Sequence, residues 1–205
     1  MRVHRATSHP SNDARDVGDG TSASASARQT AGREAWVGPA APVTWQGGDM
    51  DDVVIRASRP ADMSAVADLR WRWSVDEDGR GPTVTREEYR EAMTAFAGEH
   101  ADSHRCVVAE RGGVVLGMAW LALNARPPVP HRPRGRVAAE LQSVYVHPDL
   151  RGGGVANDLV AALLDVADEA GAERVVVHSS VVGERLYRRL GFGDARLLLQ
   201  RPPED

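Results

Sequence analysis

The chain has 205 residues, 42% of them hydrophobic, which suffices for one globular domain with a sizeable core but not for two. No apolar run approaches the roughly 18 residues of a membrane-spanning helix, and the N-terminus lacks the apolar segment of a secretory signal. The net charge of −4 argues against a nucleic-acid partner, and the single cysteine, Cys106, excludes an internal disulfide and fits a cytoplasmic location.

Residues 1–50 are expected to form a disordered extension. They are rich in small and polar residues, and they show no apolar periodicity. Such a segment cannot bury enough surface to offset the entropy lost on ordering. Met50 directly precedes an apolar strand pattern and is a candidate for the natural start of the protein. The ordered domain is therefore expected to cover residues 51–205.

The first half of this domain combines two helices with three strands. In chain order the predicted elements are a strand, a helix, a loop, a helix and the two strands of a hairpin: residues 53–57, 61–73, 74–82, 85–98, 106–110 and 114–123. Pro60 favours a helix start directly after the first strand. Thr85 and Glu88, three residues apart, form a capping box that begins the second helix.

The second half alternates strands and helices after a proline-rich loop. In chain order it comprises a loop, a strand, a helix, a strand, a helix and a closing strand: residues 124–136, 137–146, 153–170, 173–179, 181–190 and 195–200. Prolines keep regular structure out of the loop. Gly191 follows the last helix at the position where glycine commonly ends one.

The stretch from Val144 to Ala156 carries the most chemical information. It reads as a strand, a tight turn, three consecutive glycines and the start of an amphipathic helix. Glycines let backbone N–H groups approach a ligand closely, and a helix N-terminus adds about half a positive charge. Together these features predict a cradle for phosphate or pyrophosphate. The sequence lacks both the P-loop lysine and the dinucleotide glycine spacing at this point.

Two motifs resemble a known family. The stretch RGGGVA at 151–156 resembles the [QR]-x-x-G-x-[GA] coenzyme A signature of GNAT-type N-acetyltransferases. The stretch LYRRLGF at 186–192 is similar to the second signature of that superfamily, and the likeness covers about residues 53–200. The resemblance implies an α/β fold of the GNAT type, with a mixed central sheet that is splayed between its middle strands and flanked by about four helices. It also implies an N-acetyltransferase that moves an acetyl group from acetyl-CoA to a primary amine by direct attack in a ternary complex.

The resemblance further implies acetyl-CoA as co-substrate, without a metal. Backbone groups at 144–146 would pair with the pantetheine arm like an added strand, and N–H groups of the glycine turn would hold the pyrophosphate. Ser180 replaces a common asparagine and could contact the coenzyme or cap its helix. The expected cofactor-binding residues are Val144, Tyr145, Val146, Arg151, Gly152, Gly153, Gly154, Val155, Ala156, Asn157 and Ser180.

Two residues are expected to be catalytic. The resemblance puts Tyr187 near the coenzyme sulfur, where a phenol can protonate the departing thiolate. It matches Glu140 to the base of the histone-acetylating branch, and strict alternation along the strand would put Glu140 on one face with Val144 and Val146. His178, at a strand end beside the split of the sheet, is the competing base, and water alone is the third alternative.

The sequence does not identify the acceptor, because its acidic and basic residues favour different kinds of substrate. Trp73 and Glu140 are the expected substrate contacts, and the acidic residues at 76–78 favour a cationic amine. The arginines of the loop 124–136 favour an anionic group instead, either a substrate carboxylate or the 3′-phosphate of the coenzyme.

A small-molecule amine is the expected partner: an amino acid derivative, a polyamine or an aminoglycoside-like compound. It is preferred over a protein N-terminus or lysine, and no membrane partner is expected. The chain is expected to act as a monomer or homodimer. The alternative functions are a protein N-acetyltransferase and a non-catalytic acyl-CoA sensor, and a sensor could dispense with Tyr187.

Overall fold

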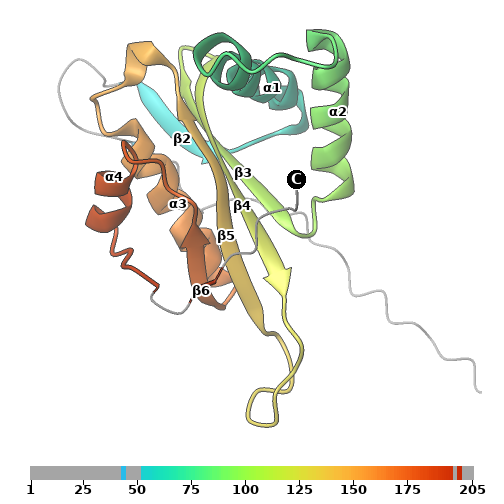
Figure 1. Ribbon diagram of the computed structural model, residues 1–205, viewed down its shortest axis with the longest axis vertical. Helices are drawn as coiled ribbons and strands as arrows, with labels where there is room; N and C mark the ends of the chain where they lie inside the picture. The colour runs from blue at the N-terminus through green and yellow to red at the C-terminus, as the bar shows by residue number, and fades with distance from the viewer. Residues whose placement is uncertain (1–42, 45–51, 196–197, 200–205) are drawn as a thin grey trace, which may run out of the picture. The chain divides into compact units, whose positions relative to one another are not determined.

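The computed structural model describes residues 43–44, 52–195 and 198–199 (Figure 1). The predicted extension 1–50 lies outside the described residues except for Val43–Thr44, which pair with the first strand of the domain. Six strands form one sheet in chain order: β1 Val43–Thr44, β2 Val53–Ala57, β3 His104–Arg111, β4 Val114–Ala125, β5 Val137–Val146 and β6 Ala172–Val177. Neighbouring strands are antiparallel except β5 and β6, which are parallel.

Four α-helices flank the described sheet: α1 Met63–Trp71, α2 Arg86–Glu99, α3 Val155–Glu169 and α4 Glu184–Arg189. Three short helical turns join them, namely η1 Pro60–Asp62, the π-helical η2 Arg72–Glu77 and η3 Pro148–Leu150. Helices α1 and α2 lie over one face of the sheet and α3 over the other (Figure 1). The mixed sheet and the number of helices agree with the expected fold class.

Each face of the sheet has its own core. The apolar stripe of α3, including Leu159 and Leu163, packs on Leu121 and Leu141. On the other face, residues of α1 and Trp120 of β4 form the second cluster. Burial of these side chains, at roughly 25 cal/mol per Å² of apolar surface, holds both helical layers on the sheet.

The structure contains the predicted features that depend only on residues close together in the chain. Thr85 Oγ1 accepts a hydrogen bond from the Glu88 N–H (3.2 Å), and Glu88 Oε2 accepts one from the Thr85 N–H (2.7 Å). This capping box begins α2 as predicted. Gly191 has φ +88° just beyond α4, in the left-handed region that glycine adopts easily.

Two predicted elements are wrong. The loop 74–82 begins as helix, because η2 continues α1 as far as Glu77. The closing strand 195–200 is absent at its described positions, since Ala195, Leu198 and Leu199 are in no strand. The hydrogen bond from Tyr145 Oη to Glu77 Oε1 (2.6 Å) explains the longer helix, because it fixes the last residue of η2 against β5.

Strand β5 contains a bulge that changes which side chains share a face. Trp120 of β4 lies opposite Ser143, but the next residue, Leu121, lies opposite Leu141. Gln142 is therefore the extra residue, and the alternation shifts there. The predicted common face for Glu140, Val144 and Val146 is wrong, because Glu140 is on the α1–α2 face while the two valines pack under α3.

The expected split of the sheet lies between β5 and β6, the last two strands that are described. Their parallel pairing runs from Val137 opposite Ala172 to Leu141 opposite Val177. Residues 142–146 of β5 continue beyond it without a partner on β6. Their backbone groups on that side are available to a ligand, except the Val146 carbonyl, which accepts a hydrogen bond from Arg151 Nε.

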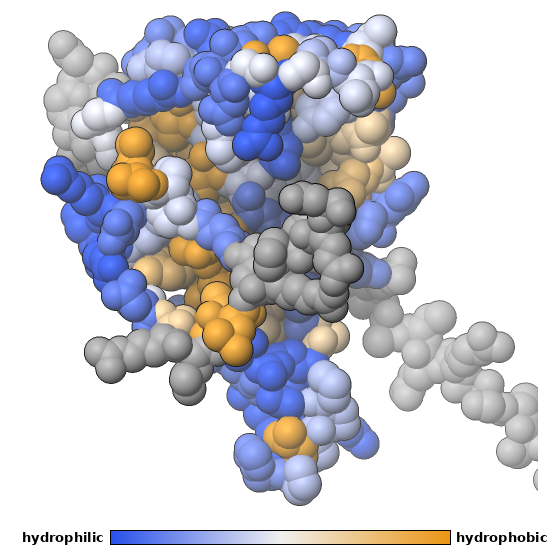
Figure 2. Space-filling model, in the orientation of Figure 1, coloured by the Kyte–Doolittle hydropathy of each residue, from blue (hydrophilic) through white to orange (hydrophobic). Residues whose placement is uncertain are grey.

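The surface of the described part is mostly polar. The face in Figure 2 is largely hydrophilic, with separate hydrophobic spots. Val181 and Val182 are 90% and 92% exposed in the turn before α4. Among the described residues, no helix is long and apolar enough to cross a membrane.

A partly buried ion pair joins β2 to η1, directly before α1. Arg56 Nη1 and Nη2 donate to Asp62 Oδ2 (2.6 Å) and Oδ1 (2.9 Å), and Arg56 Nε donates to Glu110 Oε2 (2.8 Å). Hydrogen bonds from Arg56 hold the pKa of Asp62 below its ordinary value. The carboxylate is therefore stabilised in its ionised form.

The substitution Arg56→Met is expected to lower the free energy of unfolding by about 1–3 kcal/mol, because the carboxylate of Asp62 (9% exposed) would lose its hydrogen-bonded partner. The folded pKa of Asp62 lies below the unfolded one, so this stabilisation is present at neutral pH and is lost as the pH falls through the folded pKa. Urea unfolding at about pH 7 and about pH 3 measures both effects. An equal acid-induced loss in wild type and variant would contradict this role of the pair.

Candidate active site

A cavity of about 630 Å³, here called the turn-side cavity, lies along the unpaired end of β5 and the glycine turn. Ten of the eleven predicted cofactor residues line it: Val144, Tyr145, Val146, Arg151, Gly152, Gly154, Val155, Ala156, Asn157 and Ser180. Gly153 is in the same turn but does not line the cavity. The structure thus brings together residues from β5, the turn before α3 and the turn before α4.

The backbone of the glycine turn adopts a conformation that is strained for residues with a Cβ atom. Gly152 and Gly154 have φ values of +87° and +86°, and Gly154 is the N-cap of α3. The first N–H groups of a helix have no partner within it, so those of Val155 and Ala156 face the turn with their donors free of the helix ladder. These donors and the positive end of the helix dipole suit an anion.

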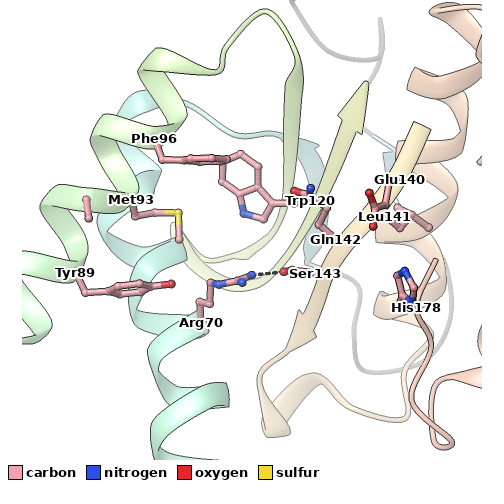
Figure 3. A pocket seen from close by; sticks show the side chains of 11 residues that line it. Arg70, Tyr89, Met93, Phe96, Trp120, Glu140, Leu141, Gln142, Ser143 and His178 are labelled. Atoms are coloured by element: carbon pink, nitrogen blue, oxygen red, sulfur yellow. Dashed lines mark hydrogen bonds between the residues drawn. The ribbon is translucent and has the colours of Figure 1, made fainter. Parts of the chain in front are cut away.

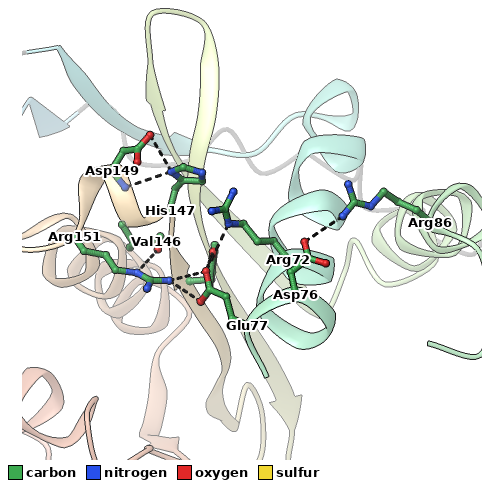
Figure 4. Close-up of polar contacts among 9 residues, drawn as sticks. Arg72, Asp76, Glu77, Arg86, Val146, His147, Asp149 and Arg151 are labelled. Carbon is green, nitrogen blue, oxygen red and sulfur yellow. Dashed lines mark hydrogen bonds and ion pairs between the residues drawn. The ribbon is translucent and has the colours of Figure 1, made fainter. Parts of the chain in front are cut away.

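Arg151 is anchored at the mouth of this cavity (Figure 4). Its Nε donates to the Val146 carbonyl (2.9 Å), and its Nη2 donates to Glu77 Oε2 (2.8 Å). Hydrogen bonds from Tyr145 and Arg151 lower the pKa of Glu77, while burial and Glu77 together raise the pKa of Tyr145 to about 12. Glu77 therefore stays ionised and Tyr145 stays protonated at neutral pH, which keeps Arg151 in a fixed position.

Tyr187 lines the turn-side cavity from α4. Its ring packs edge-on against Phe192 (5.6 Å between centroids), and burial raises the pKa of its phenol above the ordinary value. Ser180, just upstream, accepts a hydrogen bond from the Gly183 N–H (3.2 Å) and so stabilises the turn that starts α4. The phenol is held at the cavity in its protonated form.

A second cavity, of about 500 Å³ and here called the helix-side cavity, lies between the helices and β5 (Figure 3). Its lining comes from α1, α2, β4, β5 and the residue after β6: Arg70, Tyr89, Ala92, Met93, Phe96, Trp120, Glu140, Leu141, Gln142, Ser143 and His178. Helix α2 contributes an apolar and aromatic wall, while Glu140 and His178 contribute groups that can accept a proton.

The two cavities meet at the split between β5 and β6. Leu141, Gln142, Ser143 and His178 line both of them. Glu140 lines only the helix-side cavity. A group bound along the glycine turn can therefore reach a second molecule held under the helices through this opening.

Trp73, a predicted substrate contact, lies elsewhere. It lines the turn-side cavity and stacks on Tyr145 (6.2 Å between centroids), but it does not line the helix-side cavity with Glu140. The structure therefore does not bring the two expected substrate contacts into one cavity. The stacking of Trp73 on Tyr145, near the C-terminal end of β5, accounts for this separation, because Glu140 lies farther back along the strand.

The arginines of the proline-rich loop are also remote from both cavities. Arg126, Arg132 and Arg136 all form ion pairs with Glu173 (3.4, 3.6 and 2.7 Å). Glu173 is near the start of β6, whereas the cavities are at the far ends of the strands. These three arginines neutralise a carboxylate of the chain itself and do not contribute to either cavity.

Sequence reasoning missed three polar residues of the helix-side cavity, namely Arg70, Tyr89 and Ser143. Arg70 donates a hydrogen bond from Nη1 to Ser143 Oγ, and Tyr89 lines the same cavity. The three residues come from α1, α2 and β5, which are far apart in the chain. No spacing in the sequence signals such a meeting. In the described parts of the chain, no group of three or more His, Cys, Asp or Glu residues is arranged to hold a metal ion.

Comparisons with known proteins bear on this arrangement. Residues 64–192 match the model of the Acetyltransferase (GNAT) family. A mycothiol acetyltransferase of Saccharomonospora viridis is 32% identical over 112 residues, which are 52% of this chain. The chain spans about a third of the length of that curated relative, 32% of which is matched.

Solved structures of acetyltransferases share the fold. A predicted acetyltransferase from Clostridium acetobutylicum, solved with acetyl-CoA, has a TM-score of 0.61 and 22% identity, covering 73% of this chain and 96% of its own. An aminoglycoside N-acetyltransferase in complex with CoA has a TM-score of 0.55 and 19% identity, covering 73% and 94%. At these identities the likeness concerns the fold alone.

Proposed function

The chain belongs to the GNAT acetyltransferase family, and on that premise we propose that it transfers an acetyl group from acetyl-CoA to the primary amine of a small molecule. The observation that carries this proposal is that the two cavities meet at the split between β5 and β6. Their volumes of about 630 and 500 Å³ are in the range of small-molecule sites. In this proposal residues 51–205 form the catalytic domain.

The turn-side cavity fits acetyl-CoA by its backbone. Residues 142–146 leave a strand edge without a partner on β6, to which an extended pantetheine arm can hydrogen-bond. Gly152 and Gly154 keep the turn free of Cβ atoms, and the N-terminus of α3 attracts a pyrophosphate. When bound, acetyl-CoA supplies an activated acetyl thioester.

Tyr187 is proposed as the proton donor. Its phenol lines the turn-side cavity, and burial keeps its pKa above the ordinary value, so it holds its proton at neutral pH. Donation from Oη to the departing thiolate sulfur makes that sulfur a better leaving group. Phe192, packed against the ring, limits its rotation.

Glu140 and His178 are the candidates for accepting the proton of the amine. Both line the helix-side cavity, and His178 lines the turn-side cavity as well. A carboxylate or imidazole at this opening can remove the proton directly or through one water molecule. Water alone is the third alternative. We propose Glu140 as the base because its strand position is fixed by pairing with both β4 and β6.

The experiment that tests the proposed function follows release of the coenzyme thiol over a library of primary amines. We expect thiol release that depends on the amine, and a thermal shift with acetyl-CoA. A ligand at 100 times its Kd stabilises the folded state by about 2.7 kcal/mol. A thermal shift without turnover on any amine would favour a non-catalytic sensor instead.

The substitution Glu140→Gln is expected to lower kcat about tenfold near neutral pH, because the amide cannot accept the proton of the amine. The deficit should shrink at higher pH, where more of the amine is already unprotonated. His178→Gln is the matched comparison, and pH profiles of kcat for both variants decide between the two residues. A larger, pH-dependent loss of kcat in His178→Gln would assign the base to His178. Unchanged pH profiles of kcat in both variants would leave water as the base.

A further inference from the structure

We propose that the acceptor is an amine that also carries a carboxylate, as an amino acid does, and that Arg70 and the indole N–H of Trp120 bind that carboxylate. The proposal rests on the function proposed above, in which the helix-side cavity holds the acceptor. It selects one substrate class among amino acid derivatives, polyamines and aminoglycoside-like compounds.

Among the described residues, Arg70 carries a positive charge without a carboxylate partner. Its guanidinium is partly buried, donates a hydrogen bond to the hydroxyl of Ser143 and lines the same cavity as Tyr89. Nearby, Arg72, Arg86 and Arg90 each pair with a carboxylate, but no carboxylate in the described ranges is within ion-pair distance of Arg70. A guanidinium held in an aromatic cavity is costly to desolvate, and a bound anion offsets that cost.

Trp120 provides an unused hydrogen-bond donor in the same cavity. The residue is only 5% exposed, and its Nε1 is buried without a hydrogen-bond partner. Buried indole N–H groups usually find a partner. Figure 3 shows this nitrogen on the side of the ring that faces Met93 and Arg70. Arg70 of α1 and Trp120 of β4 thus contribute two hydrogen-bond donors to the same cavity, and a carboxylate can accept a hydrogen bond from each.

The rest of the lining orients such an acceptor. Glu140 and His178 lie beside β5 and β6, where the two cavities meet, so the amine belongs at that end. Met93 and Phe96 of α2 cover the space between with apolar surface, which suits an apolar side chain. An amine with its carboxylate at Arg70 and its nitrogen toward Glu140 satisfies both ends.

The acidic residues at 76–78, which favoured a cationic amine, do not line the helix-side cavity. Asp76 pairs with Arg86 (3.4 Å), Glu77 pairs with Arg151 (2.8 Å), and neither acid lines the helix-side cavity. Within that cavity Glu140 is the only carboxylate among the lining residues. A polyamine or aminoglycoside would place further positive charges near Arg70, which is unfavourable.

The test compares three acceptors with the same side chain for each of leucine, methionine and phenylalanine: the amino acid, its carboxamide, which has nearly the same shape, and its decarboxylated amine. We expect kcat/KM for the free amino acid to exceed that of both analogues at least about tenfold in at least one set, the usual size of a hydrogen bond to a charged group. Equal or better turnover of the decarboxylated amines in all three sets would overturn the proposal and leave the proposed function intact.

Variants test whether Arg70 and Trp120 cause the preference for the free amino acid. Arg70→Gln and Trp120→Phe should bring the ratio between amino acid and amine toward one, while Arg70→Lys should restore part of it. Arg86→Gln, which removes an arginine outside the cavity, is the matched control and should keep the wild-type ratio. Circular dichroism verifies folding. A wild-type ratio in folded Arg70→Gln would overturn the assignment.

A binding measurement separates this proposal from the proposed function. Calorimetry without acetyl-CoA compares N-acetyl amino acids with the corresponding N-acetyl amines. Carboxylate-dependent binding that Arg70→Gln abolishes, without transfer to any amine, would support the carboxylate site and contradict the transferase. Equal binding of both classes to wild type would overturn the carboxylate site.

Discussion

Replacement of Tyr187 by phenylalanine is expected to lower kcat about a hundredfold while the affinity for acetyl-CoA changes no more than a few-fold. The substitution removes only the hydroxyl that would protonate the departing thiolate. The ring would keep its edge-on contact with Phe192, and its contribution to the wall of the turn-side cavity would remain.

The pH dependence of the rate is an independent test of the role of the Tyr187 phenol. Burial raises the pKa of Tyr187 above its ordinary value of 10.0, so the phenol keeps its proton across the range in which amines become reactive. The wild-type rate should therefore fall only above about pH 10 for this reason. Steady-state kinetics and calorimetry with coenzyme A measure both quantities. An unchanged kcat in Tyr187→Phe would remove the acid role and leave Tyr187 as a packing residue.

The substitution Ala156→Glu is expected to weaken binding of acetyl-CoA by more than a hundredfold. Ala156 lines the turn-side cavity in the first turn of α3, where glutamate is compatible with the helix. Its carboxylate would occupy the place proposed for the pyrophosphate and repel it. Because the backbone need not change, the fold should be preserved.

The matched control is Ala161→Glu, which adds the same charge to α3 at a position that does not line the cavity. Calorimetry with coenzyme A should show near wild-type affinity for this control. Gly154 is a less suitable test site, because its φ of +86° would strain any side chain at a cost of about 1–2 kcal/mol. Tight binding by folded Ala156→Glu would overturn the phosphate assignment.

The sequence predicted correctly those features that depend on residues close in the chain. Strand β5 has the expected bounds, the capping box of Thr85 starts α2, and the helix α3 follows the glycine turn. Such features come from local hydrogen bonds and from apolar periodicity, which neighbouring residues specify. The motif at 151–156 likewise pointed to the family, because a glycine turn before a helix is itself a local structure.

Tertiary structure alone decided what depends on register and on contacts between distant segments. The bulge at Gln142 moved Glu140 to the α1–α2 face, because pairing with β4 is set by the whole ladder and not by alternation along β5. The stacking on Tyr145 places Trp73 at the turn-side cavity and away from Glu140, and the hydrogen bond from Tyr145 to Glu77 fixes the end of the helix after α1 against β5. The helix-side cavity around Arg70 is likewise a product of packing, since its residues meet only when α1, α2 and β5 come together, and no local pattern predicts that meeting.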